Sequence, residues 1–170
     1  MTEIPALSEI VIAPYLDRLG DISAEYISKI GVYAIFDRDL ILQYVGISRD
    51  IATSLRLHIV RAPDLCYWVK VTTVEKTSRT FLSEIQTAWL AGQTANAELW
   101  EQPLDCRKLM TDREKLDLTK TLGEVEEEKV LKNVARRVEK EVLELLAARG
   151  VKFDVRFNPK FKSSGILDVK

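Results

Sequence analysis

The chain has 170 residues, of which 46% are apolar and 30% are charged, values typical of a soluble globular domain. Its 25 Lys and Arg residues and 26 Asp and Glu residues leave a formal net charge of −1. This balance argues against a protein that coats nucleic acid or anionic membranes, and the apolar content excludes a disordered tail protein.

Simple counts also restrict location and metal chemistry. No uncharged apolar run approaches the ~20 residues of a membrane span, and residues 1–7 lack the features of a secretory signal. Cys66 and Cys106 are the only cysteines, so we expect reduced thiols and a cytoplasmic protein. Because His58 is the only histidine, a four-ligand zinc site is excluded, and a bound metal should prefer oxygen ligands, as Mg²⁺ and Mn²⁺ do.

The first predicted elements are a short helix and a hairpin. Residues 23–30 are predicted to be helical, with Ser23 able to cap the first turn. Residues 31–36 are rich in β-branched and aromatic side chains and predict a strand. After a turn at 37–39, residues 40–45 predict a second strand, so the two should pair as a β-hairpin.

Two helices and a third strand complete the first half of the chain. Asp50 can cap a helix that must end before Pro63, because proline cannot continue it. Residues 67–74 predict the third strand. Thr77 or Ser78 can then cap a helix whose apolar residues recur at helical spacing.

The second half of the chain is denser in charge and mostly helical. Residues 94–120 predict two short helices, interrupted at Pro103. Residues 124–149 predict a long helix with one apolar stripe, and Gly150 fits the position just beyond its end. Residues 151–157 alternate apolar and charged side chains, which predicts a half-buried strand.

These elements predict an α+β fold. We expect a small antiparallel sheet of three strands flanked by helices, followed by a helical C-terminal extension with a late strand. The corresponding division is an N-terminal segment at 1–29, a core at 30–92 and an extension at 93–170 that packs on the core as one unit.

Two short motifs lie on the predicted hairpin: Gly31-Val32-Tyr33 on one strand and Tyr44-Val45-Gly46 on its partner. A helix with Arg56 and His58 follows, and Glu84 lies in the helix after the third strand. In its motifs and in its order of elements, the chain resembles the GIY-YIG nuclease family.

The resemblance is closest to the nuclease-type domain at the N-terminus of plastid monothiol glutaredoxins. It rests on residues 31–34, 42–49, 63–66 and 69–71, and it implies a cyanobacterial stand-alone relative of that domain. No thioredoxin-like pattern follows residue 92, so we expect no glutaredoxin domain in this chain.

The resemblance implies a metal-dependent endonuclease that hydrolyses DNA. It implies that Glu84 binds Mg²⁺ or Mn²⁺, which would act as a Lewis acid on the phosphate. It also implies that Tyr33 relays a proton, assisted by Tyr44 or His58. Arg56 is the candidate to hold a phosphate through its guanidinium group.

The chain departs from the family pattern at two cation positions. Ser54 stands where the family usually has arginine, and Ile47 stands where repair-type members often have lysine. Arg49, in the preceding loop, is an alternative phosphate ligand, and Asn96 falls where repair-type members place an asparagine in the site. The plastid branch also carries serine at the position of Ser54, so a branch-specific feature and a loss of function are both open.

Each candidate also has a purely structural interpretation. Tyr33 and Tyr44 can be a cross-strand aromatic pair, and Arg56 and Glu84 can be solvated helix residues. Cys66 fits a small buried apolar side chain, with a redox role as the alternative.

Two functions of different classes therefore remain. The first is the endonuclease, with DNA as partner and no membrane. The second is a non-catalytic domain of the same fold that binds nucleic acid or a protein. Residues 1–90 carry a net charge of −2 and residues 151–170 carry +3. Either the C-terminal region contacts the nucleic acid, or the domain has moved away from cleavage.

Overall fold

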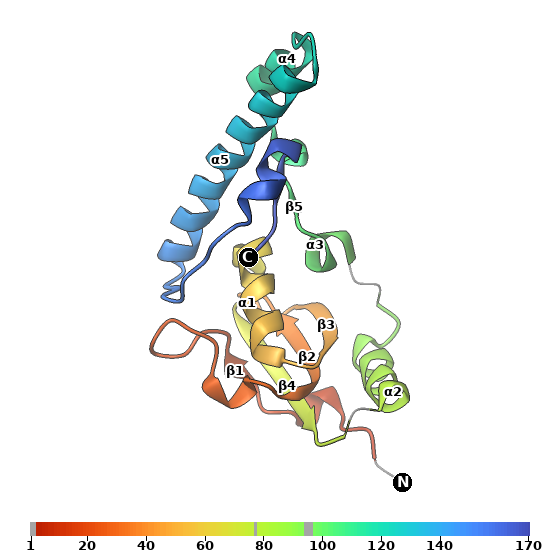
Figure 1. Cartoon of the computed structure of the whole chain (residues 1–170). Helices are drawn as coiled ribbons and strands as arrows, with labels where there is room; N and C mark the ends of the chain where they lie inside the picture. The colour runs from red at the N-terminus through yellow and green to blue at the C-terminus, as the bar shows by residue number, and fades with distance from the viewer. Residues whose placement is uncertain (1–2, 77, 94–96) are drawn as a thin grey trace.

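The computed structural model describes residues 3–76, 78–93 and 97–170. Its centre is a four-stranded antiparallel sheet in the order β1-β4-β2-β3 (Figure 1). The predicted α+β class is confirmed, but the expected count of three strands was wrong. Strands β2, β3 and β4 match the expected three, and a short strand β1 from the N-terminal segment pairs with the outer edge of β4. The bounds are β1 (Ala13–Pro14), β2 (Ile30–Phe36), β3 (Leu42–Ser48) and β4 (Trp68–Val74).

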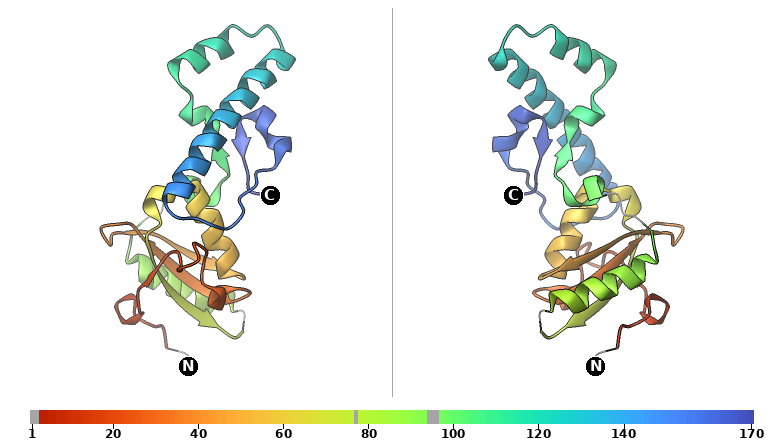
Figure 2. Two further views of the ribbon diagram at one scale, coloured as in Figure 1. Left: turned by 90° about the vertical axis from the view of Figure 1, so that its left-hand side faces the viewer. Right: turned by 90° about the vertical axis from the view of Figure 1, so that its right-hand side faces the viewer.

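Two helices cover opposite faces of this sheet. Side chains of a strand alternate between faces, and Val32 and Ala34 pack with α2 (Arg79–Leu90), whereas Tyr33 and Ile35 pack with α1 (Ile51–Arg61). The right-hand view of Figure 2 has α2 in front of the sheet. The predicted caps are present: Asp50 accepts from the backbone of Thr53 at the start of α1, and Ser78 caps α2 in the same way.

The C-terminal half extends from the sheet as a helical arm (Figures 1 and 2). It consists of α3 (Ala97–Glu101), β5 (Leu104–Asp105), α4 (Asp112–Thr119), α5 (Glu124–Ala148) and β6 (Ile166–Leu167), and β5 pairs with β6. The apolar stripe predicted for α5 is buried at Leu131, Val134, Val138, Val142 and Leu146, whereas its members Val130 and Leu145 are half-buried and exposed. At the end of α5, the Arg149 side chain donates to the carbonyls of Pro63 and Cys66 and lies on the ring of Tyr67, which ties the arm to the core.

The larger of two apolar clusters joins the N-terminal segment, the core and the arm, and the smaller one fills the α2 face of the sheet. The larger cluster joins Tyr15 and Ile22 of the N-terminal segment to the α1 face of the sheet and to the buried stripe of α5. Among the described residues, no helix is long and apolar enough to cross a membrane.

Three local predictions were wrong. Residues 23–30 form only a 3-10 turn at Ala24–Tyr26, because Ser28 takes a positive φ and the chain then enters β2. The second strand begins at Leu42 and not at residue 40, because Leu40 belongs to the preceding turn and also has a positive φ.

Residues 151–157 are not a strand. Their alternation is real, because Val151, Phe153 and Val155 pack against the main apolar cluster. However, only an isolated bridge between Phe157 and Val169 forms, so burial of one side occurs here without a partner strand.

Candidate active site

The paired motifs place both tyrosines on the α1 face of the sheet. Tyr33 lies opposite Gly46 in the β2–β3 register, and Tyr44 lies opposite Ile35. A Cβ atom at Gly46 would overlap the phenol ring and hydroxyl of Tyr33, and it would come within 2.7 Å of the Tyr44 ring. The glycine of the second motif is therefore required by the tyrosine of the first.

His58 brings α1 to the same point. Its Nε2 atom lies 2.6 Å from the Tyr33 hydroxyl, and its ring centroid lies 5.5 Å from that of Tyr33 and 5.0 Å from that of Tyr44. Only 4% of His58 is exposed, so this hydrogen bond is shielded from water. The helix phase set by the Asp50 cap turns His58 toward the sheet.

The short helix α3 covers the other side of these rings. Trp100 is stacked on Tyr44, with centroids 5.4 Å apart, and meets His58 edge-on. The next residue, Glu101, accepts a 2.8 Å hydrogen bond from the Tyr44 hydroxyl. Tyr33 is 3% exposed, Tyr44 6% and Trp100 1%, so the rings are enclosed, whereas Glu101 is exposed. We call Tyr33, Tyr44, His58 and Trp100 the ring cluster.

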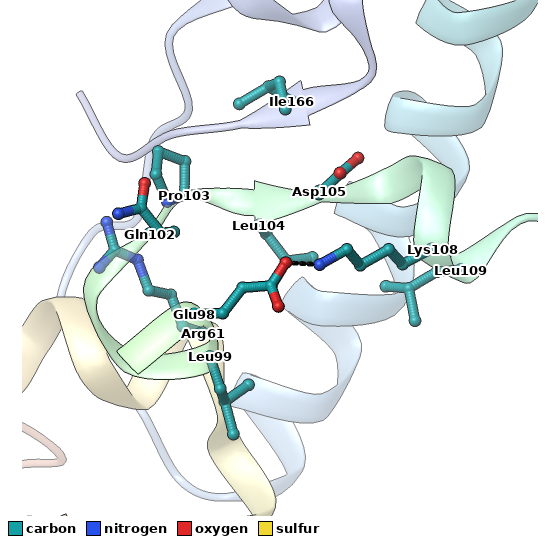
Figure 3. Close-up of a pocket in the computed structure, with 10 residues that line it drawn as sticks. All are labelled: Arg61, Glu98, Leu99, Gln102, Pro103, Leu104, Asp105, Lys108, Leu109 and Ile166. Carbon is teal, nitrogen blue, oxygen red and sulfur yellow. Dashed lines mark ion pairs between the residues drawn. The ribbon is translucent and has the colours of Figure 1, made fainter. Parts of the chain in front are cut away.

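Arg61 lies one turn after His58 and connects the ring cluster to a neighbouring pocket. Its guanidinium donates to the Trp100 carbonyl at 2.9 Å and lies 3.9 Å from the carboxylate of Asp168. The pocket has a volume of about 570 Å³ and is drawn in Figure 3, where Glu98 and Lys108 form an ion pair within it. Cationic and acidic residues both line this pocket, so their charges largely compensate.

Burial dominates the protonation of the ring cluster. It raises the pKa of Tyr33 and of Tyr44 well above the ordinary value for tyrosine, so both are neutral phenols. Burial, followed by the nearby charge of Arg61, lowers the pKa of His58 to about 4. The backbone carbonyl of Trp100 acts in the opposite direction and raises the pKa of His58. The Nδ1 atom of His58 nevertheless has no hydrogen-bond partner of normal geometry among the described residues. At neutral pH, His58 is therefore an uncharged imidazole.

Arg56 does not reach the ring cluster. Its Nε and Nη2 atoms donate to the two carboxylate oxygens of Asp21 at 2.9 and 3.0 Å. The guanidinium also lies 5.6 Å from the ring of Phe153. Arg56 thus connects α1 to the N-terminal segment and to the segment after α5.

Glu84 is also separate from the tyrosines. It is exposed on α2, the helix that packs on the opposite face of the sheet. The structure therefore brings together Tyr33, Tyr44 and His58 among the five predicted site residues, and it does not bring Arg56 or Glu84 to them.

The departures from the family pattern have local explanations. The Ser54 hydroxyl lies 2.6 Å from that of Ser48, so a small polar pair occupies the place where the family usually has a cation. Ile47 is exposed, on the α2 side of β3. Cys66 is fully buried, and burial raises the pKa of its thiol, which fits the structural interpretation. Asn96 lies outside the described residues.

Three residues of the site were missed in the sequence. Trp100 and Glu101 belong to a region without clear periodicity, and only the structure docks α3 on the tyrosines. Arg61 had a usable signal, because a residue three positions after His58 lies on the same side of the helix.

The carboxylates set limits on a metal site. Within the described ranges, no group of three or more His, Cys, Asp or Glu residues is arranged to hold a metal ion. Mg²⁺ can bind through one carboxylate when water and phosphate oxygens complete its coordination. Glu101, which is exposed and bonded to Tyr44, fits that limited role.

Comparison with known proteins gives one partial match. No family model matches the chain. A 63-residue stretch is 43% identical to a protein of Arabidopsis thaliana named bifunctional monothiol glutaredoxin-S16, chloroplastic. The stretch is 37% of this chain and 22% of that relative, so the similarity concerns one part of a longer protein. It establishes partial homology to a chloroplastic monothiol glutaredoxin, which agrees with the branch that the sequence motifs indicate.

Proposed function

We propose that this chain is a GIY-YIG-type endonuclease that hydrolyses phosphodiester bonds in DNA with Mg²⁺ or Mn²⁺. The observation that carries the proposal is the convergence of Tyr33, Tyr44 and His58 with the Glu101 carboxylate at one point of the sheet. The tyrosines and the histidine are those implied by the motifs, and they come from three separate elements. A cluster that served only to pack the core would need only apolar rings. This cluster instead includes a 2.6 Å hydrogen bond between the Tyr33 hydroxyl and His58.

The ring cluster is suited to moving a proton. A Tyr33 hydroxyl that donates to His58 Nε2 can accept a hydrogen bond at its own oxygen, where the Ser54 side chain now lies, and in the proposed reaction a water molecule takes that place and gives up a proton. The proton then passes from water to Tyr33 and from Tyr33 to His58, leaving hydroxide as the nucleophile. The neutral state of His58 is the form that accepts it.

Glu101 replaces Glu84 as our candidate for the carboxylate at the site. Tyr44 fixes one carboxylate oxygen of Glu101 and leaves the other available as a ligand. A divalent cation held there would supply the Lewis acid for the phosphate. Arg61, the buried guanidinium beside both tyrosines, is our candidate for neutralising negative charge in place of Arg56.

The enclosure of the rings supports a second function. Trp100 covers the tyrosines, and DNA reaches them only if α3 moves. Together with the engagement of Arg56 by Asp21, this favours a non-catalytic domain that binds nucleic acid or a protein. In that case, the ring cluster is an internal polar contact that fixes α3 on the sheet.

The decisive experiment compares two glutamates on supercoiled plasmid with Mg²⁺ or Mn²⁺, and with EDTA as the metal-free control. We expect Glu101→Gln to lower the nicking rate about 100-fold or more, and Glu84→Gln to change it less than about threefold. The reverse order would return the metal ligand to Glu84. Absence of nicking by the unmodified chain, or equal nicking by all three proteins, would contradict the endonuclease and favour the binding domain.

A further inference from the structure

A second site lies at the end of the sheet where β2 begins and β3 ends. A groove of about 310 Å³ is formed there by residues from β2, β3, the loop after it and the first turn of α2. Two arginines line it, and no acidic residue does. The lining residues are Ile30, Ile47, Ser48, Arg49, Arg79 and Leu82. We call this the arginine groove.

Both arginines are exposed, and neither forms an ion pair with a described residue. Among the residues that the structure describes, neither Arg49 nor Arg79 makes an ion pair or a side-chain hydrogen bond, whereas Arg56, Arg137 and Arg149 each do. A nearby carboxylate would neutralise the arginine charges, and the groove would then not attract anions. The groove instead presents two exposed arginines whose side-chain donors have no hydrogen-bond partner among the described residues.

The acidic neighbour of Arg49 is already engaged. The Asp50 carboxylate accepts from the backbone of Ser28 and from both the backbone and the hydroxyl of Thr53. These bonds cap α1 and hold the carboxylate toward the helix. Asp50 is therefore held by the helix start and forms no ion pair with Arg49.

The start of α2 adds to the positive character. Ser78 accepts from the backbone of Phe81, which leaves the N–H groups of Arg79 and Thr80 without an intrahelical partner, as at every helix start. The helix has 12 residues, and its dipole places partial positive charge at this end. Anions are favoured at such a helix start when side-chain donors lie beside it, as the two guanidinium groups do here.

We propose that the arginine groove binds the phosphodiester backbone of a nucleic acid strand, a site additional to the ring cluster. The proposal rests on the proposed function, since it takes DNA as the substrate. The groove lies at the end of the same strands: Ser48 lies opposite Gly31, two residues along the β2–β3 ladder from Gly46 and Tyr33, which is about 7 Å. Its lining residues Ile47 and Leu82 belong to the α2 face of the sheet, so a strand bound there passes around the edge strand β3 to reach the ring cluster on the α1 face. Strand β3 forms the edge of the sheet, so no neighbouring strand separates the groove from solvent.

The groove also explains how a nearly neutral chain can hold DNA. Binding of a phosphate chain needs local cations, and its strength depends on how many phosphates they contact. The pocket beside Arg61 does not offer this, because its Lys108 is paired with Glu98. The arginine groove, whose two arginines form no ion pair with a described residue, is the better candidate for holding phosphates.

The test measures binding without cleavage. The full chain is titrated, in EDTA, into fluorescein-labelled mixed-sequence DNA of about 20 nucleotides, single-stranded or duplex, over a range of salt concentrations. The double variant Arg49→Gln/Arg79→Gln is compared with Arg18→Gln/Arg136→Gln, which removes the same charge from two exposed arginines elsewhere. Melting curves check that both variants remain folded.

We expect the groove variant to bind about tenfold or more weakly, with the slope of log K against log salt for duplex smaller by about two. The control variant should bind within about threefold of the unmodified chain. Unchanged binding by the groove variant, an equal loss in the control, or no DNA binding by the unmodified chain would overturn the proposal. Displacement of DNA by millimolar inorganic phosphate would show instead that the groove takes a free phosphate.

These outcomes are separate from those of the plasmid experiment. Groove-dependent binding without nicking in Mg²⁺ or Mn²⁺ supports the arginine groove and contradicts the endonuclease. Nicking that survives in a groove variant whose DNA binding is unchanged supports the endonuclease and overturns the groove.

Discussion

The ring cluster and the arginine groove, on opposite faces of the sheet, hold their polar groups in opposite ways. In the ring cluster, hydroxyls and an imidazole are enclosed, uncharged and bonded to one another. In the arginine groove, charged groups are exposed and have no partner among the described residues. The difference matches the two roles that we propose. Proton transfer benefits from shielded, fixed partners, whereas attraction of a phosphate chain needs accessible charge.

The comparison also explains why the five predicted site residues separate. Side chains of alternate strand residues point to opposite faces, so Tyr33 and Tyr44 meet α1 and its His58. Glu84 belongs to α2 on the other face and cannot join them without a rearrangement of the sheet. The carboxylate that meets the ring cluster comes instead from the C-terminal half, where α3 supplies Glu101.

The largest expected effect is loss of the proton path. Tyr33→Phe keeps the ring but removes the hydroxyl bonded to His58, so plasmid nicking should fall by about 100-fold or more. Tyr67→Phe is the matched control, since Tyr67 contacts Arg38 and Arg149 away from the ring cluster. Its nicking rate should stay within about threefold of the unmodified chain. Undiminished nicking by Tyr33→Phe would mean that the ring cluster only packs.

The next effect is a pH dependence of the folding stability, which is caused by the burial of His58. Burial lowers the pKa of His58 to about 4 in the folded chain, below its ordinary value, so the unfolded chain binds this proton first as the pH falls. Stability contributed by neutral His58 is present above the ordinary histidine pKa and is lost progressively toward pH 4. The loss should be about 3 kcal/mol of the free energy of unfolding.

Urea unfolding at several pH values between 7 and 4 measures this loss, with His58→Gln as the comparison. The variant should be less stable at pH 7 but show a flatter dependence on pH. Parallel curves for the two proteins would place the acid sensitivity elsewhere, because other groups would then account for all of it.

A third effect tests how tightly the ring cluster is packed. Gly46→Ala places a methyl group against the rings of Tyr33 and Tyr44, and overpacking of this kind costs about 1–3 kcal/mol. In a Tyr33→Leu background, the smaller side chain should accept the methyl, so the cost should shrink. A cost that is the same in both backgrounds would show that Gly46 is needed for its backbone and not for the space it leaves.

Much of this fold could be predicted because local rules determine it. The Asp50 and Ser78 caps, the hairpin and the stripe of α5 all depend on residues close in sequence. The meeting of Tyr33, Tyr44 and His58 follows from strand alternation and helix phase, together with the two short motifs on the hairpin. These are short-range constraints that act in the same direction.

The rest depends on distant parts of the chain. Trp100 and Glu101 reach the tyrosines from over 50 residues away, and nothing in their own segment specifies that docking. The false strand at 151–157 shows the same limit, because alternation reports burial of one side and not the presence of a partner strand. The two free arginines were visible as residues, but that they share a groove is a tertiary fact.

The smallest expected effect concerns the cation that was predicted for the site. Arg56 is held by Asp21 in a two-point bond, with 36% and 32% of the two side chains exposed, and partly exposed pairs contribute roughly 0–1 kcal/mol. Arg56→Gln should therefore lower the free energy of unfolding by about 1 kcal/mol or less, and Asp21→Asn by a similar amount. Both single variants break the same ion pair, so the double variant should lose less stability than the sum of the two single losses.

Nicking by Arg56→Gln should remain within about threefold of the unmodified chain. A large fall in nicking with stability intact would instead mean that Arg56 leaves Asp21 to contact DNA, and that the DNA contacts extend beyond the arginine groove to helix α1.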